Sequence, residues 1–282
     1  MYRIVRREQL TPITFLWEVG APDVARAARP GHFVIIRAHE RGERIPLTIA
    51  DTDPAAGTVT LVIQAVGKST HEMMGLPQGA SVPDLVGPLG EASRIVCRSK
   101  VVLVGGGLGV APVYPQAKAH QAAGSFIICI LGFRTRDLVF WEDRYRAISD
   151  EMVIATDDGS YGMRGLVTDA LRDVLARHPD VEEVMAVGPL RMMRACCDVT
   201  RPLGVRTVVS LNSIMVDGTG MCGGCRVTVG GRIRFACVDG PDFDGHQVDF
   251  DELLRRERRY AREEAEAMRR YQEACRLGLP TG

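Results

Sequence analysis

Short apolar runs separated by Pro and Gly turns dominate the first 98 residues. Runs such as "HFVIIRA" and "TVTLVIQAV" have the length and β-branched content of strands, and only "STHEMMGL" has helical character. Several short strands joined by turns are typical of an antiparallel barrel. We therefore expect residues 1–98 to form an N-terminal antiparallel β-barrel.

The pattern changes from Lys100 onward. Apolar runs of strand length alternate with amphipathic stretches of helix length such as "VTDALRDVLARH". This alternation indicates a parallel sheet covered by helices, in which ligands bind at the carboxyl ends of the strands. We expect residues 99–210 to form a nucleotide-binding α/β domain, and its expected strands are "VVLV", "FIICIL", "EMVIAT", "EEVMAV" and "RTVVSL".

The remainder of the chain follows neither pattern. Residues 211–250 contain a loop rich in cysteine and glycine, which predicts a small C-terminal metal-binding domain. Residues 251–282 are helical by propensity, with opposite charges three and four residues apart. This helical tail is either a solvated surface helix or a docking arm for a partner protein.

Charge and hydropathy exclude two classes of partner. The chain has 35 Lys and Arg against 35 Asp and Glu, so no net field favours nucleic acid or an anionic membrane. It begins with the strand-like "YRIVRREQL" rather than a signal peptide, and has no run of about 18 apolar residues. We expect a cytoplasmic protein that binds neither nucleic acid nor membranes.

Two stretches of the predicted barrel suit a pyrophosphate. In "VGKSTHEM", Gly67 permits close approach of the backbone, and Ser69 and Thr70 stand where a helix begins and its N–H groups lack partners. Arg44, at the start of "RIPLTIA", can pair with the same phosphates. Both features are also common without any ligand, so a purely structural role stays open.

A second candidate site is the glycine turn in "VVLVGGGLGVAPVYP". Here a buried strand runs into a helix through Gly105, Gly107 and Gly109, which lets a dinucleotide phosphate approach the backbone. Val110 departs from the strict G-x-G-x-x-G pattern. Other strand ends carry "GFRTRD", "TDDGSYG" and "VGPLRMM", which are either ligand contacts or simple turns.

A third candidate site is the loop "MVDGTGMCGGCRV" with the cysteine that follows it. Its spacing, Asp217-x4-Cys222-x2-Cys225-x11-Cys237, matches the C-x4-C-x2-C of plant-type two-iron ferredoxins with aspartate in the first position. The glycines let the backbone fold tightly around a cluster. A tetrahedral zinc site is the alternative, and His246 or Cys275 are alternative fourth ligands.

Together these features resemble the ferredoxin reductase superfamily. The order of a barrel with "RIPLT", an α/β domain with "GGGLGVAP" and "VGPLRMM", and a cluster loop is similar to that of dihydroorotate dehydrogenase electron-transfer subunits. The stretch "IMVDGTGMCGGCRV" resembles most closely the small subunits of NADH-dependent reduced ferredoxin:NADP oxidoreductases, also called sulfide dehydrogenase subunits. The resemblance covers residues 1 to about 250.

The resemblance implies FAD in the barrel, NAD(H) in the α/β domain and a [2Fe–2S] cluster in the loop. The implied activity is hydride exchange between NAD(H) and FAD, then single-electron transfer to the cluster, so no catalytic side chain is expected. The implied contacts are Arg44, Pro46, Leu47, Thr48, Gly67, Ser69 and Thr70 for FAD; Gly107, Gly109, Ala111, Pro112, Gly188, Pro189 and Met192 for the nucleotide; and Asp217, Cys222, Cys225 and Cys237 for the cluster.

The resemblance also implies a larger flavin and iron–sulfur partner, similar to the glutamate synthase small subunit. In the resulting heterodimer, electrons would be bifurcated and would reach ferredoxin. A dihydroorotate dehydrogenase electron-transfer subunit and a non-enzymatic relay subunit are alternatives. NAD is expected on family grounds, although Arg134 and Arg136 could meet a 2′-phosphate, and the tail is expected to be dispensable for flavin and cluster content.

Overall fold

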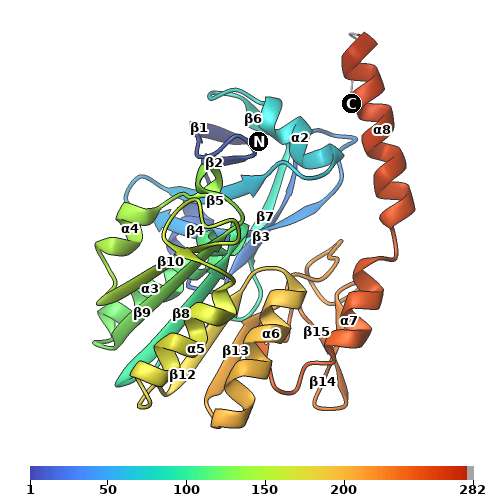
Figure 1. The fold of residues 1–282 in the computed structure, drawn as a ribbon. Coiled ribbons are helices and arrows are strands. Elements are labelled where there is room, and N and C mark those ends of the chain that lie inside the picture. Colours follow the sequence, from blue (N-terminus) through green and yellow to red (C-terminus); the bar gives the residue numbers. More distant parts are fainter. Residues whose placement is uncertain (278–282) are drawn as a thin grey trace.

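An antiparallel sheet of seven strands forms the N-terminal part of the molecule in the computed structural model, which describes residues 1–277. Its two edge strands follow one another in the chain with only Pro83 between them, so the sheet curls into the predicted barrel. In sheet order the strands are β6 (Ser81–Val82), β1 (Tyr2–Gln9), β2 (Thr14–Gly20), β5 (Thr58–Gln64), β4 (Ile45–Asp53), β3 (Phe33–Arg37) and β7 (Asp84–Leu89). Two short helices belong to this barrel: α1 (Pro22–Ala27) contacts β4, β5 and β7, and α2 (Lys68–Gly75) lies at its rim (Figure 1).

The second sheet also has seven strands, and it confirms the predicted α/β domain. All its neighbouring strands are parallel except for the last pair, and the five predicted apolar runs form β8, β9, β10, β12 and β13. In sheet order the strands are β11 (Met163–Arg164), β10 (Glu151–Thr156), β9 (Phe126–Phe133), β8 (Lys100–Gly106), β12 (Glu183–Val187), β13 (Arg206–Ser210) and β16 (Asp242–Asp244).

Helices cover both faces of this sheet because its strands are apolar on both sides. Val101 and Leu103 pack with α3 (Val110–Ala122), whereas Val102 and Val104 pack with α5 (Val167–Arg177) and α6 (Leu190–Thr200). The shorter helices are η1 (Gly107–Gly109), η2 (Arg136–Leu138), α4 (Glu142–Arg146) and η3 (Arg201–Leu203).

The C-terminal region is interwoven with the other two domains. It contains the hairpin of β14 (Arg226–Val229) and β15 (Arg232–Phe235), then strand β16 within the α/β sheet, then α7 (Phe250–Glu257) and α8 (Ala261–Leu277). Helix α7 belongs to the core, since its Phe250 and Leu253 are buried with Cys225 and Cys237. Helix α8 instead stands beside α2 at the rim of the barrel (Figure 1). Within residues 1–277, no helix is long and apolar enough to cross a membrane.

All three domains meet at a partly buried polar junction formed by Ser93, Gln116 and Asp242. The hydroxyl of Ser93, which follows the barrel, donates to the Asp242 carboxylate and accepts a 2.6 Å hydrogen bond from Gln116 Nε2 of α3. The backbone N–H of Ser93 donates to the Pro30 carbonyl in the barrel (2.8 Å). Burial of the Asp242 carboxyl raises its pKa above the ordinary 3.8.

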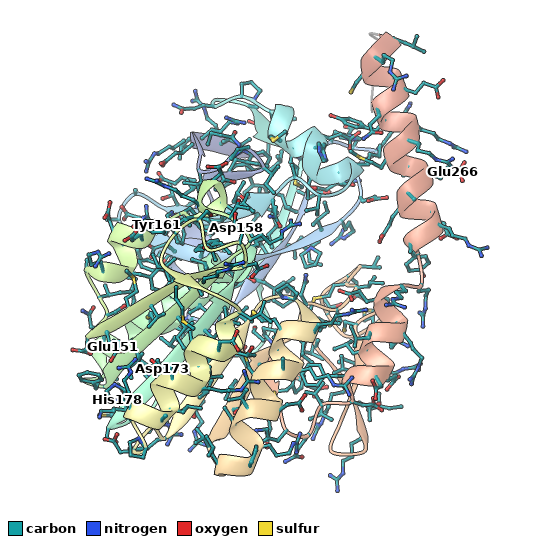
Figure 2. The ribbon with its side chains drawn as sticks, viewed as in Figure 1. Glu151, Asp158, Tyr161, Asp173, His178 and Glu266 are labelled. Carbon is teal, nitrogen blue, oxygen red and sulfur yellow. The ribbon has the colours of Figure 1, made fainter. Side chains whose placement is uncertain are left out.

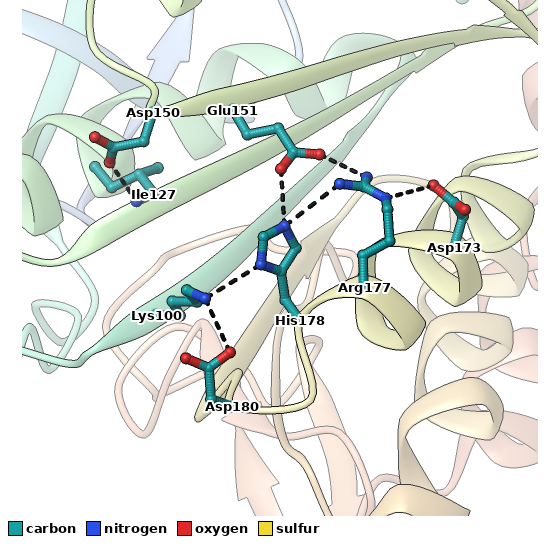
Figure 3. Close-up of polar contacts among 8 residues, drawn as sticks. All are labelled: Lys100, Ile127, Asp150, Glu151, Asp173, Arg177, His178 and Asp180. Carbon is teal, nitrogen blue, oxygen red and sulfur yellow. Dashed lines mark hydrogen bonds and ion pairs between the residues drawn. The ribbon is translucent and has the colours of Figure 1, made fainter.

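Charged side chains form a separate network at the amino edge of the α/β sheet. Glu151 accepts from Arg177 (2.6 Å) and from His178 Nε2 (2.9 Å), and Lys100 Nζ contacts both His178 Nδ1 (3.2 Å) and Asp180 (2.9 Å) (Figure 3). This edge is opposite the glycine turn that follows β8. The network therefore ties the starts of β8 and β10 to the end of α5 and is no part of the candidate site.

We expect Asp242→Asn to change how stability depends on pH. Because burial raises the pKa of Asp242, its contribution to folding is present below pH 3.8 and is lost as pH rises through the pKa of the folded state. The free energy of unfolding of the native protein should therefore fall relative to that of Asp242→Asn as pH rises above 3.8. Denaturant titrations at several pH values measure this, with the exposed Asp143→Asn as control. A pH-independent difference would contradict the prediction.

Candidate functional site

The glycine turn after β8 and the segment after β12 form one surface, as the sequence predicts. A Cβ at Gly106 would lie 2.1 Å from Met192 Sδ, and a Cβ at Gly109 would lie 2.1 Å from the Val187 carbonyl oxygen. Gly109 therefore requires glycine so that the two strand ends can approach, whereas the flexible Met192 side chain could move away from a side chain at position 106. Gly188 lies against the same Met192 side chain.

Gly107 lies at a part of this surface that no other residue among 1–277 covers. Its φ of +56° favours glycine, and no atom lies within 4 Å of the place where its Cβ would be. Ala111 is buried and Pro112 half-buried in the first turn of α3, while Pro189 is exposed before α6. Gly107 therefore leaves its own surroundings open to a ligand at the start of α3.

The rim of this surface is formed by the ends of β9 and β10. The guanidinium of Arg136 lies over the Tyr161 ring, 5.6 Å from its centroid, and the Arg136 N–H donates to Ser160 Oγ (2.8 Å). Asp158 binds Ser160 (2.6 Å), and its backbone N–H donates to the Arg134 carbonyl (3.3 Å). Figure 2 shows Asp158 and Tyr161 at the end of the sheet nearest the barrel, far from Glu151 and His178.

The predicted flavin contacts on β4 divide between its two faces. Leu47 is buried in the barrel core, whereas Pro46 and Thr48 point to the other face, as alternation along a strand requires. Only the backbone of Leu47 is available to a ligand on that outer face. Arg44, just before β4, is exposed.

The predicted hydroxyls at the start of α2 are used within the chain. Ser69 Oγ donates to Glu43 (2.6 Å), and Thr70 Oγ1 accepts from the backbone N–H groups of Val66 (2.9 Å) and Gly67 (3.0 Å). These bonds shape the turn that precedes the helix. A phosphate at this turn would therefore bind the N–H groups of the first turn of α2 rather than the two hydroxyls.

The cysteine loop brings its candidate ligands together only in pairs. The Sγ atoms of Cys225 and Cys237 lie 3.2 Å apart in the core, while the Asp217 carboxylate accepts from the N–H groups of Cys222 (2.7 Å) and Thr219 (2.9 Å). Burial raises the pKa of Cys237 to about 12, and the Thr219 N–H lowers the pKa of Asp217. Within residues 1–277, no three His, Cys, Asp or Glu side chains surround one metal position.

The donor chemistry of this loop nevertheless fits an iron–sulfur cluster. It offers three thiols and a carboxylate, and the Gly224 N–H donates to Cys222 Sγ (3.4 Å), the type of bond that tunes a cluster. The alternative ligands are held elsewhere, because His246 Nε2 contacts Thr200 Oγ1 (2.9 Å) and Cys275 is on α8.

One contact joins the barrel to the cysteine loop. Arg44 Nε donates to the carbonyl oxygen of Val216 (2.9 Å), the residue before Asp217. Gly218 packs on the barrel too, because its Cβ would lie 2.7 Å from Leu89 Cδ1. Helix η1 of the glycine turn also contacts β5 of the barrel. The cysteine loop therefore lies against the barrel beside Arg44, and the glycine turn contacts the barrel at β5.

The C-terminal region adds contacts to the cysteine loop that the sequence reading missed. Arg256 of α7 donates to the Gly224 carbonyl (3.2 Å), and Glu252 accepts from Thr228 on β14 (2.5 Å). Neither residue belongs to a motif, and only the fold places α7 beside the loop.

Comparison with known proteins identifies similar chains that this chain matches over most of their length. A family model described as the iron–sulfur cluster binding domain of dihydroorotate dehydrogenase B matches residues 212–249. The chain is 50% identical over 268 residues to an electron transfer subunit homolog of dihydroorotate dehydrogenase B (NAD(+)) from Thermotoga maritima, covering 95% of this chain and 94% of that one. It is 31% identical to the corresponding electron transfer subunit from Fusobacterium nucleatum, over 86% of this chain and 95% of that one.

Solved structures show the same relationship. A chain from the NADH-dependent reduced ferredoxin-NADP oxidoreductase, described in connection with flavin-based electron bifurcation, has a TM-score of 0.91 and 48% identity, covering 96% of this chain and 97% of that one. Phthalate dioxygenase reductase shares the fold at 16% identity, with a TM-score of 0.59 over 81% of this chain and 85% of that one.

We expect Gly109→Ala to destabilise the protein by about 1–3 kcal/mol, because overpacking in a well-packed interior costs this much. The new methyl group would meet the backbone of Val187, which is not able to move aside without shifting β12. Chemical denaturation measures the free energy of unfolding. Gly75→Ala is the control, since nothing lies within 4 Å of its Cβ position. Equal stabilities of the two variants would show that the turn has room for a side chain.

Proposed function

The chain belongs to the family of dihydroorotate dehydrogenase B electron transfer subunits, and on this basis we propose that it is the small subunit of an electron-bifurcating NADH-dependent ferredoxin:NADP oxidoreductase. The predicted family, fold and electron-transfer function are confirmed at this level. The protein is an electron-transfer subunit of a complex with a larger partner. The nature of that partner, and ferredoxin as its substrate, are part of the proposal.

The observation that carries the proposal is the Arg44–Val216 hydrogen bond. It links the arginine proposed for the flavin phosphates to the loop proposed for the cluster. Electron transfer requires neighbouring redox centres. This contact supports a flavin site and a cluster site that are held close to each other.

The surrounding residues suit the cofactors of this family. FAD accepts or donates a hydride at its flavin, and a [2Fe–2S] cluster carries one electron at a time. Arg44 and the first turn of α2 offer a cation and N–H groups to a pyrophosphate, which FAD has and FMN lacks. Pro46 and Thr48 line the outer face of β4, and the glycine turn with Gly188 and Met192 would orient NAD(H).

The proposed cluster ligands are Asp217, Cys222, Cys225 and Cys237. Their support is the ferredoxin-like spacing, the burial of Cys225 and Cys237, and the Gly224 N–H directed at Cys222. Cys222 is exposed, and exposed apolar side chains lie beside it: Met221 is 88% exposed and Val216 51%. Apolar surface left in water favours an interface, so we propose that the larger subunit covers this loop.

A dihydroorotate dehydrogenase complex is the second candidate, because the family model and several relatives carry that name. Purifying the chain with its native partner distinguishes the two. A partner with flavin, iron–sulfur clusters and NADP(H) turnover supports the bifurcating oxidoreductase. A partner that oxidises dihydroorotate rejects it. Reduction of the bound flavin by NADH in the isolated chain would exclude a relay subunit without nucleotide turnover.

We expect Arg44→Ala to weaken FAD binding by about tenfold to a hundredfold, because it removes a charged hydrogen-bond donor. The measurement is the rate at which free flavin fluorescence appears after the flavin-loaded protein is diluted. Arg41→Ala is the matched control, since this arginine is also exposed. Equal release from both variants would contradict the phosphate role of Arg44.

We expect Asp217→Ala to lose its cluster at least about tenfold faster than the native protein, because a ligand position is opened. Asp217→Cys keeps the ligand charge, so it should retain iron and acid-labile sulfide while its absorption and paramagnetic spectra change. His246→Ala and Cys275→Ala should retain the native spectra. Full iron content and an unaltered spectrum in Asp217→Ala would reject the assignment, and zinc in place of iron would reject the cluster.

A further inference from the structure

Helix α8 touches the rest of the protein along a single stripe. Its partly covered residues are Ala267, Met268, Tyr271 and Ala274, which recur at helical spacing, and its other residues are exposed. This stripe faces α2, and Figure 1 shows the two helices side by side. Figure 2 shows Glu266 on a different side of α8.

The centre of this contact is an aromatic pair. The rings of Tyr271 and His71 have centroids 6.1 Å apart and are tilted by 51°, a favourable arrangement. Tyr271 also lies near the Glu72 carboxylate, which is paired with Lys68 (3.0 Å). The tail therefore packs on the middle of α2, at His71 and Glu72.

His71 connects this pair to the proposed flavin phosphate site. Its Nδ1 donates to the carbonyl oxygen of Gly67 (2.9 Å), which is also bonded by the Thr70 hydroxyl (3.0 Å). Gly67 is the residue that precedes the first turn of α2, so its peptide orientation sets how the turn enters the helix. A continuous series of contacts thus runs from Tyr271 through His71 to Gly67.

The other end of α2 is fixed without the tail. Met73 is fully buried in the barrel core, and Arg7 donates to the Met74 carbonyl (2.9 Å). Because Ser69 also bonds Glu43 without the tail, loss of the α8 contact would leave α2 in place and loosen only the His71–Gly67 contact at the start of the helix. This is the part of α2 that offers N–H groups to a phosphate.

We propose that Tyr271 is a positioning residue for the flavin, acting through His71 on the Gly67 turn, and that the C-terminal helix is part of the flavin site. This inference rests on the proposed function, since it requires FAD phosphates at α2. It revises the expectation that the tail is dispensable for flavin content. The ligand involved is the pyrophosphate portion of the cofactor.

The test is the rate of FAD release from the flavin-loaded full-length chain after dilution, followed by flavin fluorescence. Tyr271→Ala should release FAD about threefold to tenfold faster, because one aromatic contact is lost. Tyr271→Phe keeps the ring and should restore the native rate. Glu266→Ala, on the same helix, should release FAD at the native rate, and iron content should be unchanged in all three variants.

The series of contacts from Tyr271 to Gly67 also predicts how two substitutions combine in one protein. If Tyr271 acts through His71, Tyr271→Ala should add little to the release rate of His71→Ala, whereas independent effects would multiply. Native release from Tyr271→Ala while Arg44→Ala releases FAD faster would overturn the role of Tyr271 and leave the flavin site intact. Native release from both variants would overturn the proposed flavin site as well.

Discussion

The buried carboxyl group of Asp242 is the constraint on which the arrangement of the domains depends. It comes from the C-terminal region, and Ser93 connects it to Gln116 in the α/β domain and to Pro30 in the barrel. A buried polar group is costly unless its partners are present, so the junction is stable only when all three domains are correctly placed. This requirement acts against domain movement, which a chain of loosely linked modules would permit.

A fixed arrangement matters for a protein that carries electrons between cofactors. The apolar core supports it, because Phe33 and Ile35 of the barrel pack in one cluster with Cys225 and Cys237 of the C-terminal region. On the other side, α3 packs on Leu16 and Val62 of the barrel. The barrel thus packs against both the cysteine loop and the α/β domain. The distances between the sites follow from side-chain packing rather than from linker length.

Local patterns in the sequence were sufficient for the fold class and for the approximate positions of the sites. Apolar runs identified five central strands, and the glycine spacing identified the turn after β8, since both depend on residues close in the chain. The sequence does not predict strand β16. Its three residues, Asp242–Asp244, are too few to show a strand pattern, and they pair with β13, which is distant in the sequence.

The site was predicted less completely, for the same physical reason. The Arg44–Val216 bond spans 172 residues and no motif encodes it. Nor does the sequence indicate that the hydroxyls of Ser69 and Thr70 at α2 bind Glu43 and the turn itself. Motifs indicate which backbone a ligand approaches, whereas the surrounding fold decides which side-chain atoms remain available to it.

The pairing of β16 with β13 has a consequence for how the chain is synthesised. Until residues 242–244 have emerged from the ribosome, the edge of β13 has unpaired N–H and carbonyl groups, and such an open edge can pair with another chain. The α/β domain, although its parallel strands end at Ser210, is therefore completed only when the C-terminal region folds back on it. A nascent chain interrupted between these points would expose an aggregation-prone edge, so late folding of the C-terminal region protects the sheet as well as forming the cysteine loop.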